Sequence, residues 1–357
     1  MAKNEVINRS GAEVTAVAAV AGVAAVGGKL ARDRRSKRIG AERAYRLRSD
    51  EPVPDGIRRI ARGQIDDAHD DLDAASGRKV GIAVHEARKS LKRLRAAVRL
   101  ARGTIGDETY RYENTAFREA GRRLSGARDA KVLIETLDTV ERAAADELRS
   151  GASAELRAQL ESQHEAALES LRRGGATEAV QADLERSRAR VAAWTFETGG
   201  FDSLEPGLRR IYRRGRRAMQ AAAAEQTNEN LHDWRKRVKD LWHATQILRP
   251  ASPKRIKKLS NRLHDLSDLL GDDHDLAVLG ACVDGHPRCF DDPAEQVALA
   301  GVIDRRRRAL QGQALRLGAS LYKQSPKSFT RSLSRRWRKR VGASSGRAPE
   351  LVFAAPA

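Results

Sequence analysis

Two stretches of the chain decide its fold: VHEARKSLKRLRAAVRLA at residues 84–101 and LHDWRKRVKDLWHATQIL at residues 231–248. From Val84 onward, the apolar residues of the first stretch recur at steps of three or four, and the second stretch repeats this spacing from Leu231. Such steps bring side chains onto one face of an α-helix. Both stretches are therefore predicted to be amphipathic helices, each with one seam of residues facing a core.

A polar stripe rich in basic residues runs beside each apolar seam, centred about 120° around the helix from it. In the first stretch the stripe holds His85, Arg88, Lys89, Lys92, Arg95 and Arg99. In the second stretch it holds His232, Arg235, Lys236, Lys239 and His243. Like charges three or four residues apart destabilise a helix by roughly 0.2–0.5 kcal/mol per pair. Because this unfavourable pattern occurs twice, we interpret it as an anion-binding surface rather than a solvated helix face.

The two stretches belong to a longer internal similarity. His85 and His232 are 147 positions apart (232 − 85 = 147), and Leu124–Asp129 resembles Leu270–Asp275 at a spacing of 146 (270 − 124 = 146). Two separate anchors at nearly one spacing indicate an internal duplication, with about four helices in each copy. The position of His243 holds an alanine in the first copy, so we do not expect strict symmetry between the two binding surfaces.

The composition favours a helical protein with a polyanionic partner. Hydrophobic residues make up 40% of the 357 residues and aromatic residues only 4%, so the cores must consist mainly of aliphatic side chains. The abundance of Arg and Glu adds to the preference for helix over strand. With a net charge of +20, the excess basic residues repel one another in the compact state and destabilise it. Nucleic acid, anionic lipid and polyphosphate would each relieve that repulsion.

Apolar periodicity predicts an all-α fold of two pseudo-symmetric four-helix bundles, over residues 57–198 and 201–341, preceded by a short accessory helix within residues 1–50. Helices of the first bundle are expected over residues 57–75, 80–102, 108–140 and 154–193. Those of the second are expected over residues 205–224, 228–248, 253–284, 293–322 and 326–341. Residues 342–357 are typical of a frayed tail.

The segment before residue 50 differs from the two bundles. Val14–Gly28 carries no charged residue, but it is shorter and richer in Ala and Gly than a membrane span of about 20 apolar residues. It also lacks the basic region and the cleavage site of a secretory signal. We expect an accessory helix in a cytoplasmic protein, with contact to a membrane or a partner as the alternative.

Two cysteines, Cys282 and Cys289, are too few for a disulfide framework and fit a reducing compartment. They flank His286, and with Asp291 as a fourth ligand they could form a zinc site. The preferred interpretation is a loop between helices. No metal and no other cofactor is therefore expected.

The sequence resembles the CHAD domain, a helical family named for its conserved histidines. The resemblance covers residues 57–341 and rests first on two motifs, Val84–Lys89 with Leu94-Arg95 and Leu231–Lys239. It rests also on Arg128-Asp129, Leu269–Leu276 and Gly207–Gly215, and on Gly318, Tyr322, Pro326, Phe329 and Trp337.

The resemblance implies two helical bundles related by a pseudo-twofold axis, with a basic cleft that binds inorganic polyphosphate. Members of this family are associated with polyphosphate granules, and some are fused to a CYTH triphosphatase domain. The glutamate-rich strands of that domain are not found here, so we predict a stand-alone, non-catalytic polyphosphate-binding protein on cytoplasmic granules. Basic residues expected to extend the site are Arg209, Arg213, Lys258 and Arg262. The sequence leaves the oligomeric state open.

A metal-dependent phosphohydrolase is one alternative function. His264-Asp265 and His274-Asp275 resemble the His-Asp pairs of such enzymes, and Asp272-Asp273 could bind a divalent ion. However, Arg128-Asp129 occupies the place of His274-Asp275 in the first copy, which a set of metal ligands would not tolerate. We interpret Asp129 and Asp275 as partners that orient basic residues, or as helix caps.

Nucleic-acid binding is the other alternative, because the positive charge permits contacts to phosphates. The sequence contains no helix-turn-helix or zinc-finger pattern, and its few aromatic residues offer poor stacking platforms for bases. Trp234 and Trp242 are predicted to lie in or beside the core. We therefore expect only weak, nonspecific binding of nucleic acid at low salt.

Overall fold

The computed structural model describes residues 40, 44–74 and 80–345, without the side chains of residues 127, 128 and 341–345. The chain divides into two compact units, Met1–Tyr45 and Arg46–Ala357, and the architecture below is that of the second unit. Within the described residues every regular element is a helix, which confirms the all-α prediction. None of these helices is long and apolar enough to cross a membrane. The expected N-terminal helix and the tail beyond residue 345 lie outside the described residues.

The part of the chain before residue 200 contains α2 (Val53–Asp73), α3 (Val80–Ala101), α4 (Asp107–Arg123), α5 (Gly126–Ala143), α6 (Ala154–Arg173) and α7 (Ala176–Ala192). The part after it contains η2 (Phe201–Ser203), α8 (Glu205–Ala224), α9 (Asn228–Ile247), η3 (Arg249–Ala251), α10 (Pro253–Gly285), η4 (Pro287–Cys289), α11 (Pro293–Leu321) and α12 (Pro326–Ser345). The internal duplication stays a prediction.

Helix starts follow from local chemistry. The Thr227 hydroxyl accepts a hydrogen bond from the Asn230 amide at 3.2 Å and caps α9. The Asp292 carboxylate accepts one from the Ala294 amide at 2.8 Å and caps α11. Helices α10, α11 and α12 each begin with a proline, whose missing amide hydrogen costs nothing in the first turn.

Two predicted helices proved to be broken, and the expectations for residues 108–140 and 154–193 were wrong in this respect. Gly174-Gly175 separates α6 from α7, and Gly175 has a φ of 58°, a left-handed conformation that ends a right-handed helix. Leu124-Ser125 separates α4 from α5. There Ser125 donates both its amide (3.1 Å) and its hydroxyl (2.8 Å) to the Arg122 carbonyl oxygen, which replaces the helical pattern.

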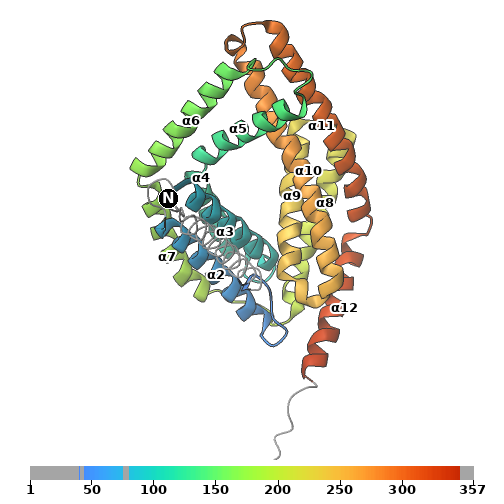
Figure 1. The fold of residues 1–357 in the computed structure, drawn as a ribbon. Coiled ribbons are helices and arrows are strands. Elements are labelled where there is room, and N and C mark those ends of the chain that lie inside the picture. The colour runs from blue at the N-terminus through green and yellow to red at the C-terminus, as the bar shows by residue number, and fades with distance from the viewer. Residues whose placement is uncertain (1–39, 41–43, 75–79, 346–357) are drawn as a thin grey trace, which may run out of the picture. The chain divides into compact units, whose positions relative to one another are not determined.

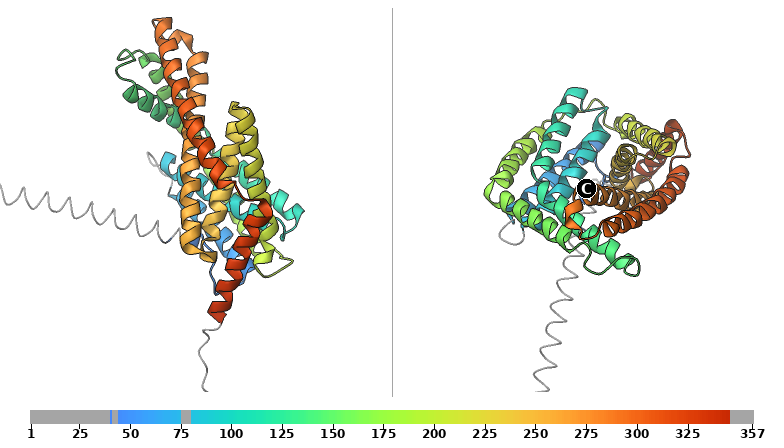
Figure 2. Two further views of the ribbon diagram at one scale, coloured as in Figure 1. Left: turned by 90° about the vertical axis from the view of Figure 1, so that its right-hand side faces the viewer. Right: turned by 90° about the horizontal axis from the view of Figure 1, so that it is seen from above.

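The helices form two packed groups (Figure 1). Helices α2, α3, α4 and α7 contact one another in the first group, and α8, α9, α10 and α11 in the second, with α12 against α8. Helices α10 and α11, of 33 and 29 residues, run past the ends of the 20-residue α8 and α9 (Figure 2). Every residue of both predicted seams is buried. The seam of α3 consists of Val84, Ala87, Leu91, Leu94, Val98 and Ala101, and that of α9 consists of Leu231, Trp234, Val238, Leu241 and Thr245, with Leu248 just after the helix.

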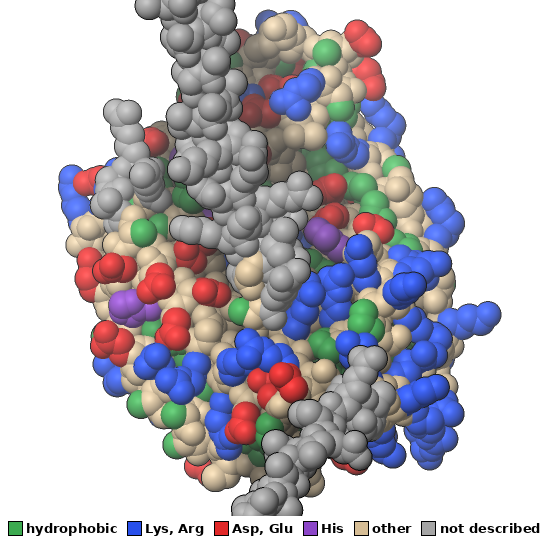
Figure 3. All heavy atoms as spheres, turned by 60° about the horizontal axis from the view of Figure 1, so that its bottom comes forward, with side chains coloured by type: hydrophobic (Ala, Val, Ile, Leu, Met, Phe, Trp, Pro, Cys, Tyr) green, Lys and Arg blue, Asp and Glu red, His purple; other side chains and the backbone are tan. Residues whose placement is uncertain are grey.

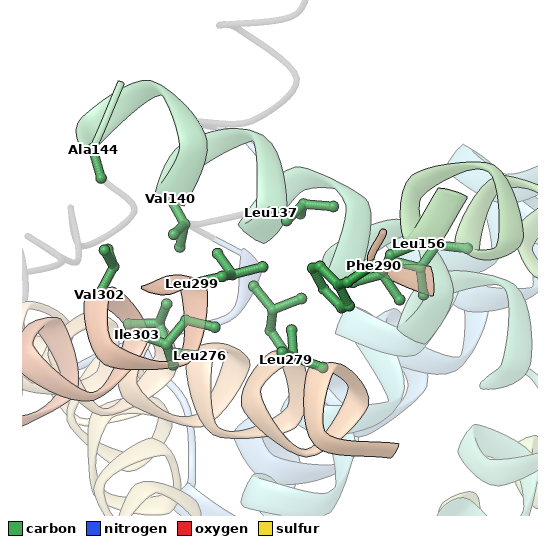
Figure 4. Close-up of a cluster of buried hydrophobic side chains, with 12 residues drawn as sticks. Leu137, Val140, Ala144, Leu156, Leu276, Leu279, Phe290, Leu299, Val302 and Ile303 are labelled. Atoms are coloured by element: carbon green, nitrogen blue, oxygen red, sulfur yellow. The ribbon is translucent and has the colours of Figure 1, made fainter. Parts of the chain in front are cut away.

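Helices α5 and α6 pack against each other, and α5 contacts α10 of the second group. Figure 4 shows the shared core, in which Leu137 and Val140 of α5 face Leu276 and Leu279 of α10 and Leu299 of α11. Full burial of such a side chain contributes about 1.5–3 kcal/mol relative to exposure. The two parts of the sequence are therefore joined by a common hydrophobic core as well as by the chain.

The groups also meet where α3 contacts α8 and α9. Arg99 donates a hydrogen bond to Asp240 Oδ1 at 2.9 Å, while the other oxygen of Asp240 lies 3.5 Å from Arg237 Nη1. A Cβ atom at Gly207 would lie 1.9 Å from the Leu100 carbonyl oxygen, so glycine alone lets α8 approach α3 this closely. This junction fixes the position of the α3 stripe relative to the α9 stripe.

Candidate anion-binding site

A pocket of about 490 Å³ lies where α3, α5, α9 and α10 meet, and we call it the central pocket. Its lining residues are His85, Arg88, Lys92, Asp129, Val132, Leu133, Arg235, Lys239, His274, Asp275 and Val278. Five members of the predicted stripes thus share one pocket, three from α3 and two from α9. The fold thus brings together basic side chains from two helices that are far apart in the sequence.

Helix α3 contributes Arg88 to the pocket in a fixed orientation. The guanidinium Nη1 donates a hydrogen bond to the Leu124 carbonyl oxygen at 2.9 Å, just past the end of α4. Carbonyl groups at a helix C-terminus carry partial negative charge and attract cations. The imidazole of His85 is 46% exposed and the Lys92 side chain is exposed, so this wall of the pocket is largely hydrated.

Helix α9 contributes a less hydrated wall. Arg235 is 20% exposed, and its Nη2 lies 3.9 Å from Asp275 Oδ1. Burial, together with the nearby charges of Arg235 and Lys92, lowers the pKa of Lys239 to about 8. A cation that is costly to keep charged at this position would be stabilised by an anion in the pocket.

Two histidines stack beside this wall. The rings of His232 and His274 have centroids 4.3 Å apart and an interplanar angle of 32°. Burial, followed by the charge of Arg235, lowers the pKa of His274 to about 4, and burial with the charge of Lys236 lowers the pKa of His232. Both rings are therefore neutral at pH 7 in the absence of an anion and can each donate one hydrogen bond.

His274 is a pocket residue that the predicted stripes did not include. It lies on α10, within Leu270–Asp275, the segment that matches Leu124–Asp129 in the internal similarity. That internal match could have pointed to His274 from the sequence. Its last residues, Asp129 and Asp275, both line the pocket. Asp275 lies beside Arg235 and so agrees with its interpretation as an orienting partner. The Arg128 side chain lies outside the described residues.

Two basic residues of the stripes lie outside the pocket and face carboxylates on their own helices. Lys89 forms an ion pair with Glu86, one turn earlier on α3. Lys236 lies 3.5 Å from Asp233, one turn earlier on α9. In both stretches, the equivalent lysine therefore has a carboxylate partner on its own helix.

The remaining stripe residues lie further along the two helices. Arg95 donates a hydrogen bond to Asn114 Oδ1 at 3.4 Å, and burial lowers its pKa to about 10. Arg99 belongs to the junction with Asp240. His243 is buried, and burial with the charge of Arg93 lowers its pKa to about 3. None of the three lines the central pocket, and Arg99 links α3 to α9 beside it.

The four basic residues predicted to extend the site lie elsewhere. Arg209 forms an ion pair with Glu205 on α8, and Arg213 is exposed on the same helix. Lys258 and Arg262 line a different pocket, between α10, α11 and α12. None of the four lines the central pocket.

The acidic residues proposed for a divalent ion do not converge. Asp273 is 2% exposed and accepts hydrogen bonds from Arg307 at 3.2 Å and Gln311 at 2.7 Å. His264 lies 3.0 Å from Asp268 on the exposed side of α10. In the described part of the chain, no group of three or more His, Cys, Asp and Glu side chains is arranged to hold a metal ion.

Comparisons with known proteins concern the fold and the family of the chain. The fold is similar to PptA from Streptomyces chartreusis, with a TM-score of 0.56 and 15% identity, covering 77% of this chain and 100% of that one. The CHAD domain from the plant Ricinus communis matches with a TM-score of 0.47 and 17% identity, over 78% of this chain and 94% of that one. No curated protein sequence matches the chain. Residues 59–284 match the family model of the CHAD domain, and the chain belongs to the CHAD domain family.

Proposed function

We propose that this CHAD protein binds inorganic polyphosphate in the central pocket and does not cleave it. The observation that carries the proposal is the convergence of Arg88 and Lys92 from α3 with Arg235 and Lys239 from α9. Four basic side chains face only two carboxylates, Asp129 and Asp275, among the lining residues. The lining residues thus carry more positive than negative charge, and a partly desolvated excess of positive charge favours a polyanion.

The residue types suit a chain of phosphates. Arginine presents a planar fork that binds two oxygens of one phosphate, while lysine contributes a mobile point charge. Successive phosphates of a flexible chain could occupy the α3 side and the α9 side in turn. Single phosphate should bind far more weakly, because fewer contacts form with it than with a chain of phosphates.

Binding without hydrolysis is part of the proposal. Phosphoryl transfer relies on metal ions or on positioned groups that activate a nucleophile. Asp273 is held by Arg307 and Gln311, and Asp275 lies beside Arg235, so these carboxylates serve the basic residues. The family's association with polyphosphate granules supports a place on such granules in the cytoplasm.

A calorimetric titration of long-chain polyphosphate at near-physiological salt tests this function, with duplex DNA of matched charge as the competitor. We expect binding that DNA does not displace. The variant Lys92→Ala/Lys239→Ala should lose most of the affinity, whereas the matched control Lys89→Ala/Lys236→Ala, on the same two helices but outside the pocket, should lose little. Equal losses in both variants, or equal affinity for DNA, would leave only a basic surface and contradict the proposal.

A further inference from the structure

A second pocket, of about 290 Å³, lies between the first turns of α10, the end of α11 and the first half of α12. We call it the α10–α12 pocket. Its basic lining residues are Arg255, Lys258, Arg262 and Lys323, and no acidic residue lines it. Arg262 and His274 are 12 residues apart on α10 (274 − 262 = 12), about 18 Å along the axis, so this pocket is separate from the central one.

Within the described part of the chain, no carboxylate pairs with the basic residues of this pocket. Arg262 donates a hydrogen bond to the hydroxyl of Ser320, and that hydroxyl donates to the Leu317 carbonyl oxygen at 2.6 Å. A neutral group on α11 therefore orients the guanidinium and leaves its charge available. On α6, by contrast, Arg172 and Arg173 both pair with Glu169.

The helices that border the pocket add to its positive electrostatic potential. The first turns of α10 and α12 contain no acidic residue, although acidic side chains are the ones that a helix N-terminus favours. Over its whole length, Pro326–Ser345, helix α12 carries seven Lys and Arg residues and no acidic one. Figure 3 shows basic side chains gathered on the right of the view and mixed with acidic ones on the left.

The shape of the pocket selects a compact anion. Beside its four cations, the pocket is lined by apolar residues that include Ile256, Leu259, Phe329 and Leu333. Its volume is at the lower end of the range of about 300–1,000 Å³ that is usual for small-molecule sites. A pocket of this volume holds one or two phosphate groups, whereas a long phosphate chain would extend beyond it.

We propose that the α10–α12 pocket is a second anion site, which binds a compact phosphate group, either as free pyrophosphate or as the headgroup of an anionic lipid. Arg262, held by Ser320, supplies the fork for the phosphate oxygens, and Lys258, one turn earlier on α10, supplies a mobile charge. The site is independent of polyphosphate binding in the central pocket.

Calorimetric titration of inorganic pyrophosphate into the full chain tests the site. Lys258→Ala/Arg262→Ala should weaken binding at least about tenfold, because two charged contacts are lost. The control Lys254→Ala/Lys257→Ala removes the same charge from exposed positions of α10 that do not line the pocket, and should change the affinity less than about twofold. Equal effects of the two variants would overturn the proposal.

Two further measurements separate the sources and the sites. Cosedimentation with phosphatidylglycerol vesicles that is lost only in Lys258→Ala/Arg262→Ala would identify a lipid headgroup as the phosphate source. No effect of that variant on either pyrophosphate or vesicles would overturn the proposal. Lys92→Ala/Lys239→Ala should keep pyrophosphate binding, and its loss there would place the anion in the central pocket instead. Circular dichroism melting of each variant confirms that the fold is retained.

Discussion

The two walls of the central pocket come from sequence stretches of the same pattern, yet they differ in hydration. On α3, His85 is about half exposed and Lys92 is exposed. On α9, Arg235 is 20% exposed, and burial brings the pKa of Lys239 down to about 8. Electrostatic interactions strengthen as water is removed. The α9 wall should therefore contribute most of the affinity, and the α3 wall should mainly extend the length of phosphate chain that is bound.

The arginines at equivalent places in the two stretches also differ. Arg88 holds the carbonyl of Leu124 at the break between α4 and α5. Arg235 lies against α10, which continues without a break through the corresponding residues and offers Asp275 instead. An arginine that holds a helix end offers a phosphate only its remaining N–H groups, whereas one beside a carboxylate can exchange that partner for a phosphate.

Asp240 links the two helices that form the walls, and its removal should have the largest effect, a loss of stability. Asp240→Ala removes the carboxylate partner of Arg99 at the junction, where Arg99, Arg237 and Asp240 are 14–16% exposed, while Arg237 keeps Asp233. We expect a loss of about 2–4 kcal/mol in the free energy of unfolding, measured with urea, since a partly buried charge loses its partner. Asp240→Asn should lose less, because it keeps the shape and one acceptor. A loss under about 0.5 kcal/mol would show that the junction does not depend on this pair.

Single lysine substitutions compare the walls directly. Lys239→Ala should raise the Kd for polyphosphate about tenfold or more, the usual value of a charged contact in a desolvated site. Lys92→Ala should raise it only about two- to fivefold, as expected for an exposed pair. Calorimetry at constant salt measures both. The reverse order of the two variants would contradict the difference in hydration.

A double-mutant cycle asks whether the walls bind one ligand. Lys92 and Lys239 should show a coupling of about 0.5–1.5 kcal/mol in polyphosphate binding, because one chain contacts both. Lys89 and Lys236, which pair with Glu86 and Asp233 outside the pocket, should be additive. Additivity at Lys92 and Lys239 would indicate two separate sites.

The pH dependence should give the smallest effect, with opposite signs for stability and binding. Since the pKa of Lys239 falls from 10.5 in the unfolded chain to about 8, its charged form destabilises the free protein. This cost is fully present below pH 8 and disappears as the pH rises toward 10.5, so the Tm should rise. Polyphosphate needs the charged amine, so its affinity should fall about two- to fivefold between pH 7 and 9.

Lys239→Met provides the control for both trends. It should flatten the rise in Tm and the fall in affinity over this range, because the titrating amine is gone. If the variant kept the wild-type pH dependence of binding, another group would have to be responsible. Lys236→Met, an exposed neighbour on the same helix, should leave both trends as they are.

The sequence predicted most of the helices well, and the two helix breaks that it missed have different causes. The start of α9 and the seams of α3 and α9 depend on periodicity and caps, which are local. At Leu124-Ser125, the local hydrogen bonds of Ser125 are joined by a distant partner, since Arg88 donates to the Leu124 carbonyl oxygen from another helix. At Gly174-Gly175 the signal was present in the sequence, because two adjacent glycines favour a left-handed turn.

By itself, the sequence determined that the protein is all-α, where its apolar seams run, and that two helices carry a basic stripe. Those properties follow from residue types at helical spacing. Only the tertiary structure decided which basic residues converge: Lys92 and Lys239 line the central pocket, while Lys89 and Lys236 do not. Whether a residue lines a pocket, and how much free energy it costs to keep its side chain charged there, depends on the elements that pack against its helix. Contacts between residues far apart in the chain set both quantities.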